Sequence, residues 1–191
     1  MNRNIVFCLA LLFFCSCSSD KKSAEKAVPE VQVKSAVQID PKTQQLENLK
    51  KATPSSLEDL EKLVPEKLAD IKRTKIFMTS NLGYATVRAD YEKNSKTYVH
   101  LAIFDCTGEM GTQLFNNNYL SYINNDAQDA DGYRKTIELF GGKAIEKYDD
   151  KTKVSTLRFF TNGKVLVELS GKNIDFDQIK AAAGEMNLKA S

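Results

Sequence analysis

The side chains best suited to acid–base or nucleophilic chemistry are few and scattered in this sequence. His100 is the only histidine, and a histidine that acts as a general base needs a nucleophile and an orienting carboxylate beside it. The chain carries no Gly-x-Ser-x-Gly pattern, which would place a serine nucleophile on a strand-to-helix turn. We therefore expect His100 to be a structural or surface residue, and we expect the protein not to be an enzyme.

Cys106 is the second candidate for reactive chemistry. A thiol becomes reactive when a helix N-terminus or basic neighbours lower its pKa. Its neighbours here include Asp105 and Glu109, which would raise the pKa instead. This favours a buried, inert cysteine, with an intermolecular disulfide or a redox role as the alternative.

Two segments match ligand-binding loops only in part. Residues 124–132 alternate oxygen-bearing side chains, but a calcium loop has its glycine in the middle and a glutamate at its end. Gly141-Gly142-Lys143 lacks the remainder of a phosphate-binding motif and precedes a predicted strand. Both segments are predicted to be turns, and we expect no metal or cofactor site.

The elements that would position these residues are mainly strands. Apolar residues and turn signals predict strands over residues 71–78, 84–92, 97–105, 133–140, 143–148, 153–160 and 164–170. Helical spacing is found over 55–64, over 113–124 and from Asp175 onward, with Ser55 and Asp175 as predicted N-caps. Because the strands come in blocks, we expect an α+β fold: an antiparallel sheet of about six or seven strands packed with helices, similar to an α-β-α sandwich.

The strand over 97–105 carries apolar residues on both faces, which is typical of a central strand. One face holds Val99 and Leu101, and the other holds Tyr98, His100 and Phe104. If helices do not fully cover that second face, Tyr98 and Phe104 would form an apolar groove suited to a lipid or peptide. Together with His100, they are our candidate binding face.

The N-terminal segment has the features of a signal peptide. Arg3 precedes a continuous apolar run over 5–14, roughly half the length that a membrane-spanning helix needs but suitable for a signal peptide. Phe14-Cys15-Ser16-Cys17 resembles the bacterial lipobox. The resemblance implies cleavage after residue 16 and lipidation of Cys17, while Ser18, in place of a retention aspartate, implies the outer membrane.

Composition then divides the remaining chain. Residues 17–53 are rich in Lys, Glu, Gln and Ser and contain no aromatic residue, which predicts a flexible tether, although Leu46 and Leu49 allow a short helix over 42–51. Residues 54–191 form the predicted single domain.

The charge of the mature chain is nearly balanced. Of 27 basic residues, only Arg3 lies in the predicted signal peptide, so 26 basic residues remain against 25 acidic residues. This balance argues against nucleic-acid binding.

From Leu60 onward the chain resembles a loosely defined group of bacterial, Bacteroidetes-like lipoproteins. The resemblance lies in Leu63-Val64-Pro65, Ala89-Asp90-Tyr91, 101–105, Gly141-Gly142 with Glu146-Lys147-Tyr148, and 165–171. The strand order is also similar to the PsbP/Mog1-like α-β-α sandwich, whose members mostly act as binding or assembly factors.

Together these patterns predict a lipid-anchored lipoprotein of the bacterial cell envelope that binds a protein or peptide partner at the membrane. The alternative is a carrier that holds a small apolar ligand in a groove of the sheet. The predicted membrane contact is the lipid on Cys17.

Overall fold

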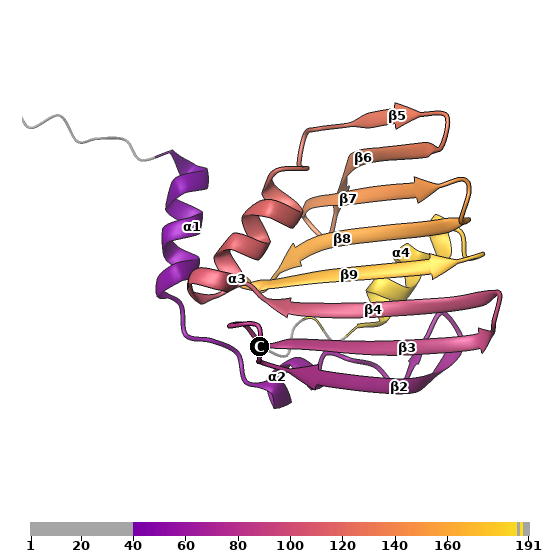
Figure 1. The fold of residues 1–191 in the computed structure, drawn as a ribbon, viewed down its shortest axis with the longest axis horizontal. Coiled ribbons are helices and arrows are strands. Elements are labelled where there is room, and N and C mark those ends of the chain that lie inside the picture. The colour runs from indigo at the N-terminus through magenta and orange to yellow at the C-terminus, as the bar shows by residue number, and fades with distance from the viewer. Residues whose placement is uncertain (1–39, 187, 189–191) are drawn as a thin grey trace, which may run out of the picture. The chain divides into compact units, whose positions relative to one another are not determined.

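Nine strands form one antiparallel sheet in the computed structural model, which describes residues 40–186 and 188 (Figure 1). The predicted signal peptide, Cys17 and the tether as far as residue 39 lie outside the described residues. The strands are β1 (Lys67–Leu68), β2 (Ile71–Thr79), β3 (Thr86–Asn94), β4 (Thr97–Asp105), β5 (Ala127–Asp129), β6 (Gly132–Leu139), β7 (Gly142–Asp149), β8 (Val154–Thr161) and β9 (Val165–Lys172).

The spatial order of the strands is β1-β2-β3-β4-β9-β8-β7-β6-β5. The chain thus makes two up-and-down ribbons, which join where β4 pairs with β9. The predicted α+β class and the antiparallel sheet are confirmed, but the predicted number of strands is wrong. The sequence pattern missed β1 and β5 because they are two and three residues long, too short to show an alternation.

Four α-helices and one π-helical turn accompany the sheet in the described chain. They are α1 (Pro41–Lys51), α2 (Leu57–Glu61), α3 (Gly108–Phe115), the π-helical turn η1 (Asn116–Leu120) and α4 (Phe176–Glu185). The helix predicted over 113–124 therefore starts five residues earlier than expected and is completed by η1. None of the described helices is both long and apolar enough to cross a membrane.

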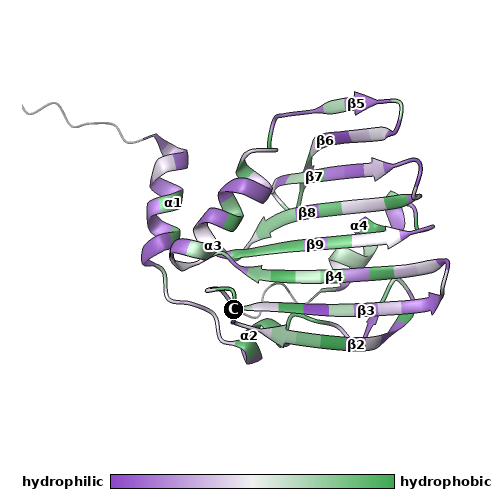
Figure 2. Cartoon of the chain, viewed as in Figure 1, coloured by the Kyte–Doolittle hydropathy of each residue, from purple (hydrophilic) through white to green (hydrophobic). Residues whose placement is uncertain are grey.

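The sheet separates two hydrophobic cores. On one face, Val99, Leu101 and Ile103 of β4 join the main core, to which α2 and α4 contribute Leu60 and Ile179. On the opposite face, a smaller core lies under α1, α3 and η1, and includes these residues: Leu49, Cys106, Phe115, Tyr119, Ile145 and Leu166. Figure 2 shows the hydrophobic colour concentrated along β4, β8 and β9 at the centre of the sheet.

Helix α1 corrects the predicted domain boundary. It lies within the segment predicted as a tether, yet Leu49 is buried in the smaller core and α1 packs against α3. Asp40 caps the helix by accepting a hydrogen bond from the Thr43 N–H. The folded region therefore begins before residue 54.

The local signals for turns and caps were mostly read correctly. Asn162 and Gly163 both have positive φ, which asparagine and glycine adopt more readily than other residues, and they lie in the three-residue connection between β8 and β9. Asp175 and Gln178 form the predicted capping box of α4. The N-cap of α2 is Ser56 and not Ser55, because the Ser55 N–H donates to the Asp105 carboxylate instead.

Candidate functional site

The predicted binding face is only partly assembled. The Tyr98 and His100 rings lie together, with centroids 4.4 Å apart, and His100 Nδ1 lies 2.7 Å from an Asp90 carboxylate oxygen. Phe104 points to the same side of β4 but packs against the smaller core and makes an edge contact with Tyr84. The structure therefore brings Tyr98 and His100 together and places Phe104 in a separate cluster.

Asp90, His100 and Ser170 occupy matching positions on β3, β4 and β9. A serine nucleophile would need a hydrogen bond to the histidine. The Ser170 hydroxyl instead pairs with Thr156 Oγ1 at 3.2 Å, and the described residues show no Ser170–His100 hydrogen bond. This row forms a polar surface cluster without an activated nucleophile.

The other candidates for chemistry are structural in the described chain. Cys106 is a free, fully buried thiol, and burial, followed by the charge of Asp105, raises its pKa. Part of the segment 124–132 forms strand β5. Among residues 40–186 and 188, no group of three His, Cys, Asp or Glu side chains is placed to hold a metal ion.

The second half of β2 is a free edge of the sheet. β1 pairs only with Ile71 and Lys72, and the sheet order ends on that side. Within the described chain, no strand pairs with the outer side of residues 74–79. Figure 1 shows this strand along the lower border of the sheet.

Three consecutive large apolar residues are exposed on this edge. Ile76, Phe77 and Met78 are 36%, 60% and 38% exposed. Their side chains lie on both faces of the strand, because neighbouring side chains point to opposite faces. Figure 2 shows the same stretch as a hydrophobic patch near the arrowhead of β2. We call residues 74–79 the β2 edge.

The opposite edge of the sheet is covered only in part. β5 is three residues long, exposed, ends in Asp129 and pairs only with residues 132–134 of β6. Further along β6, the Thr136 N–H donates to the Asp126 carboxylate. Short, charged edge strands resist pairing with other chains, whereas long apolar edges invite it. The apolar residues of β6, Ile137 and Leu139, are packed against the main core, whereas the apolar run on β2 is exposed. This difference singles out the β2 edge as the candidate functional site.

The charges beside the β2 edge are mostly positive. Lys72 and Lys75 are exposed on β2, and the Lys75 ammonium lies 3.8 Å from the Glu92 carboxylate. Arg73 is held by Glu66 at 2.6 Å. A strand that pairs with the β2 edge would contact apolar side chains and neighbouring lysines. A partner strand that carries both apolar and acidic residues would therefore complement this edge.

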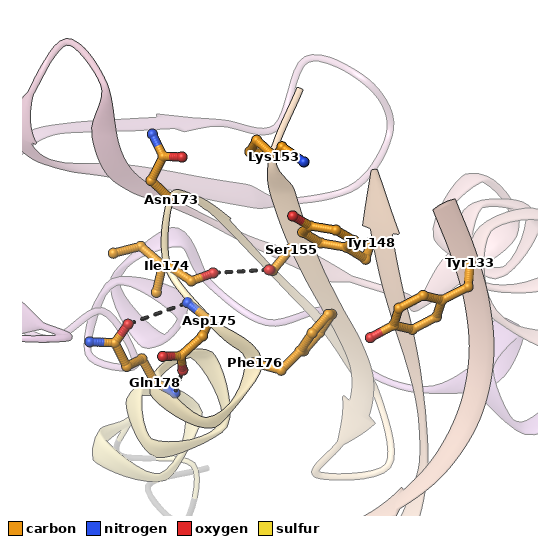
Figure 3. Close-up of a pocket in the computed structure, with 9 residues that line it drawn as sticks. All are labelled: Tyr133, Tyr148, Lys153, Ser155, Asn173, Ile174, Asp175, Phe176 and Gln178. Carbon is orange, nitrogen blue, oxygen red and sulfur yellow. Dashed lines mark hydrogen bonds between the residues drawn. The ribbon is translucent and has the colours of Figure 1, made fainter. Parts of the chain in front are cut away.

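A broad cleft of about 620 Å³ opens on the main-core face, between the start of α4 and strands β6 to β8 (Figure 3). The Tyr133, Tyr148 and Phe176 rings form one side. Its polar groups already serve the fold: Ser155 donates to the Ile174 carbonyl, and Asp175 and Gln178 cap α4. The cleft therefore offers few uncommitted groups to a ligand.

Beside this cleft lies a buried carboxylate, Glu146, which is 2% exposed. One of its oxygens accepts hydrogen bonds from the Tyr133 hydroxyl at 2.8 Å and from Lys135, whose ammonium lies 2.9 Å away. The Lys180 ammonium of α4 lies 3.0 Å from the other oxygen. Burial raises the pKa of Glu146, but these three donors outweigh it and hold the pKa below its ordinary value of 4.5.

We expect this network to make the stability of the domain depend on pH. A lowered pKa in the folded state means that ionised Glu146 stabilises the fold above about pH 4.5, and that this contribution disappears as the pH falls through the folded-state pKa. Glu146→Gln should therefore lower the free energy of unfolding by about 1–2 kcal/mol near neutral pH. Urea unfolding from about pH 7 to pH 3 measures the difference between wild type and variant, which should shrink towards acid pH. A constant difference would contradict the assignment.

No protein family, curated protein or solved structure matched this chain. The resemblance to Bacteroidetes-like lipoproteins and to the PsbP/Mog1-like sandwich therefore stays a prediction. The β2 edge was not predicted from the sequence. The signal for it was the unbroken run of Ile76, Phe77 and Met78, which departs from a simple alternation of apolar and polar residues.

Proposed function

We propose that this protein is a lipid-anchored envelope protein whose domain binds an extended segment of a partner protein along the β2 edge. The exposed run of Ile76, Phe77 and Met78 on an unpaired strand carries the proposal. A segment added to this edge would gain backbone hydrogen bonds, and its alternate side chains would reach the two faces of the sheet.

The partner segment has a definite chemistry. It would carry apolar residues against Ile76, Phe77 and Met78, and acidic residues near Lys72 and Lys75. Apolar contacts contribute roughly 25 cal/mol for each Å² removed from water, and opposite charges favour the correct register. The predicted lipid on Cys17 would keep this edge close to the membrane, where envelope partners are found.

The alternative prediction, a carrier of a small apolar ligand, has less support. The cleft in Figure 3 is bordered by Lys153, Asp175 and Gln178, and most apolar residues of the central strands β4 and β9 are packed into the two cores. Native mass spectrometry of protein extracted from its own cells distinguishes the two functions, because a carrier would retain a small molecule.

Photo-crosslinking in intact cells tests the proposal at the edge itself. A photoreactive amino acid at position 75, beside the apolar run, should give a discrete adduct with a partner protein. Phe77→Lys should lower the adduct yield at least ten-fold, because the ammonium group cannot be buried under an apolar side chain without a large desolvation cost.

Phe140→Lys is the matched control. Phe140 is 58% exposed, close to the 60% of Phe77, but lies in the turn between β6 and β7. This variant should retain the adduct. Equal losses in both variants, or an adduct of one chain with a second copy only, would contradict the proposed partner binding.

The membrane anchor is tested in the same cells. Cys17→Ser should release the protein from the membrane fraction, and intact-mass analysis of the wild type should show acyl groups on residue 17. A variant that remains in the membrane fraction at full yield would contradict the anchor, while the photo-crosslinking result would still report on the β2 edge.

A further inference from the structure

A small cavity with a strong excess of positive charge lies on the smaller-core face, far along the sheet from the β2 edge. It measures about 170 Å³ and is bordered by β6, β7, β8, η1 and the turn after η1. Arg134, Lys147 and Arg158 line it together with Asn118, Tyr122 and Thr156. Among the side chains that line it, none is acidic.

Two of these cations face each other directly across the sheet. Arg134 of β6 is the register partner of Lys147 of β7. Like charges in directly opposite positions destabilise a strand pair, and an anion bound between the half-buried Arg134 and the exposed Lys147 would relieve this repulsion. Thr156 is the next partner of Lys147, on β8, and adds a hydroxyl group to the same row.

Neither Arg134 nor Lys147 forms an ion pair with a carboxylate of the described chain, although both also line a neighbouring depression that contains Asp129, Asp131 and Asp149. Arg134 donates two hydrogen bonds to the Asn125 carbonyl, at 3.2 and 3.1 Å, and its guanidinium lies 4.5 Å from the centre of the Tyr122 ring. Lys147 makes no hydrogen bond or ion pair with any residue of the described chain. Asp149, two residues further along β7, accepts hydrogen bonds from the amide and hydroxyl of Thr152, and these bonds, with a smaller contribution from the charge of Lys147, lower the pKa of Asp149.

Arg158 differs from the other two cations. Its guanidinium is paired with Glu168 of β9 and donates to the Asn118 carbonyl. It therefore holds η1 against the sheet and shapes the wall of the cavity. The two cations without an ion pair in the described chain are Arg134 and Lys147. The described structure also shows no hydrogen bond from the Tyr122 hydroxyl or the Asn118 side chain.

We infer that this cavity binds a phosphate group. A phosphate has several acceptor oxygens, and arginine forks, lysine ammonium groups and hydroxyls from different strands suit it well. The cavity is much smaller than the roughly 300–1,000 Å³ of sites that enclose a whole small molecule. It would therefore bind the phosphate group of a larger ligand, while the remainder of that ligand stays outside the cavity. The phosphate could belong to a lipid headgroup or to a soluble molecule.

Isothermal titration of the full chain, purified in detergent, with inorganic phosphate tests the inference. The titration is run at low ionic strength against a chloride control of equal ionic strength. We expect saturable binding of one phosphate, and Lys147→Gln and Arg134→Gln should each weaken it at least ten-fold. Absence of saturable binding to the wild type would overturn the inference.

Lys143→Gln is the matched control, because it removes the same charge from the same strand. Lys143 lies outside the cavity and donates to Asn124. Its loss should change phosphate affinity less than two-fold. An equal loss in the Lys143 and Lys147 variants would show a general effect of surface charge and overturn the inference.

Thermal unfolding in chloride alone supplies a second readout. Lys147→Gln should leave the melting temperature unchanged or raise it, since it removes a like-charge contact. A fall of several degrees that the Lys143 variant does not share would make Lys147 a structural residue and overturn the inference.

A further titration distinguishes the two sources of phosphate. Water-soluble dihexanoyl-phosphatidylglycerol replaces inorganic phosphate, with dihexanoyl-phosphatidylcholine as the zwitterionic control. Tighter binding of the anionic lipid than of phosphate, lost in Lys147→Gln, would assign the cavity to a lipid headgroup. Binding of phosphate without such binding of the lipid would assign it to a soluble ligand. This test does not depend on the β2 edge.

Discussion

Replacing Asp105 by alanine will lower the free energy of unfolding by about 3–4 kcal/mol. Asp105 ends β4 and is fully buried. Its carboxylate accepts hydrogen bonds from the Ser55 N–H at 2.9 Å and from the Thr107 hydroxyl at 2.8 Å and N–H at 3.2 Å. The variant would leave these donors without their partner, and each buried unpaired group costs about 1–3 kcal/mol.

The effect should be specific to this buried position. Asp131→Ala removes an exposed carboxylate that pairs with Lys151 at 2.7 Å, and surface pairs contribute only about 0–1 kcal/mol. Urea unfolding of both variants by circular dichroism measures the difference. Similar losses in the two variants would show that Asp105 does not hold the segment before α2 to the end of β4.

Gly111→Ala should destabilise the domain by about 2–3 kcal/mol. Gly111 is buried in α3, where the helix passes over the end of β4. A Cβ atom there would lie 2.6 Å from the carbonyl carbon of Cys106 and 2.7 Å from the carbonyl oxygen of Asp105. Because both are backbone atoms, relief requires α3 to move away from the sheet and to loosen the smaller core.

Gly184→Ala, the same change in α4, should have the opposite sign. No atom lies within 4 Å of the Cβ position there, and alanine in a helix interior is favoured over glycine by about 0.5–1 kcal/mol. Thermal and urea unfolding measure the change in stability of each variant relative to the wild type. A neutral Gly111→Ala would show that α3 does not pack as closely as the structure indicates.

The long strands could be predicted because each has a residue pattern that is independent of its neighbours. Alternation located β3 and β4, and Asn162-Gly163 located the turn between β8 and β9. β1 and β5 could not be found this way, since such short strands exist only because a longer strand lies beside them. Helix α1 lies in the predicted tether because its sequence buries one residue, Leu49, and this burial depends on α3 and the rest of the smaller core.

The sites were harder to predict than the elements. The alternation of β4 placed Tyr98 and His100 on one face, and the structure has them in contact. The same pattern could not tell that Phe104, further along that face, lies beside the helices of the smaller core. The facing cations Arg134 and Lys147 are thirteen positions apart in the sequence, and only the register of β6 on β7 makes them neighbours.

By itself, the sequence determined the α+β class, the positions of the long strands and the cap of the last helix, because these depend on interactions over a few residues. Only the tertiary structure decided which strand carries its apolar residues on a free edge and which charges meet without an ion pair in the described chain. Both depend on the order and register of strands that are distant in the sequence. The sequence of one strand does not specify which other strand it will pair with. Thus the run Ile76-Phe77-Met78 is visible in the sequence, but its exposure at an unpaired edge is a property of the assembled sheet.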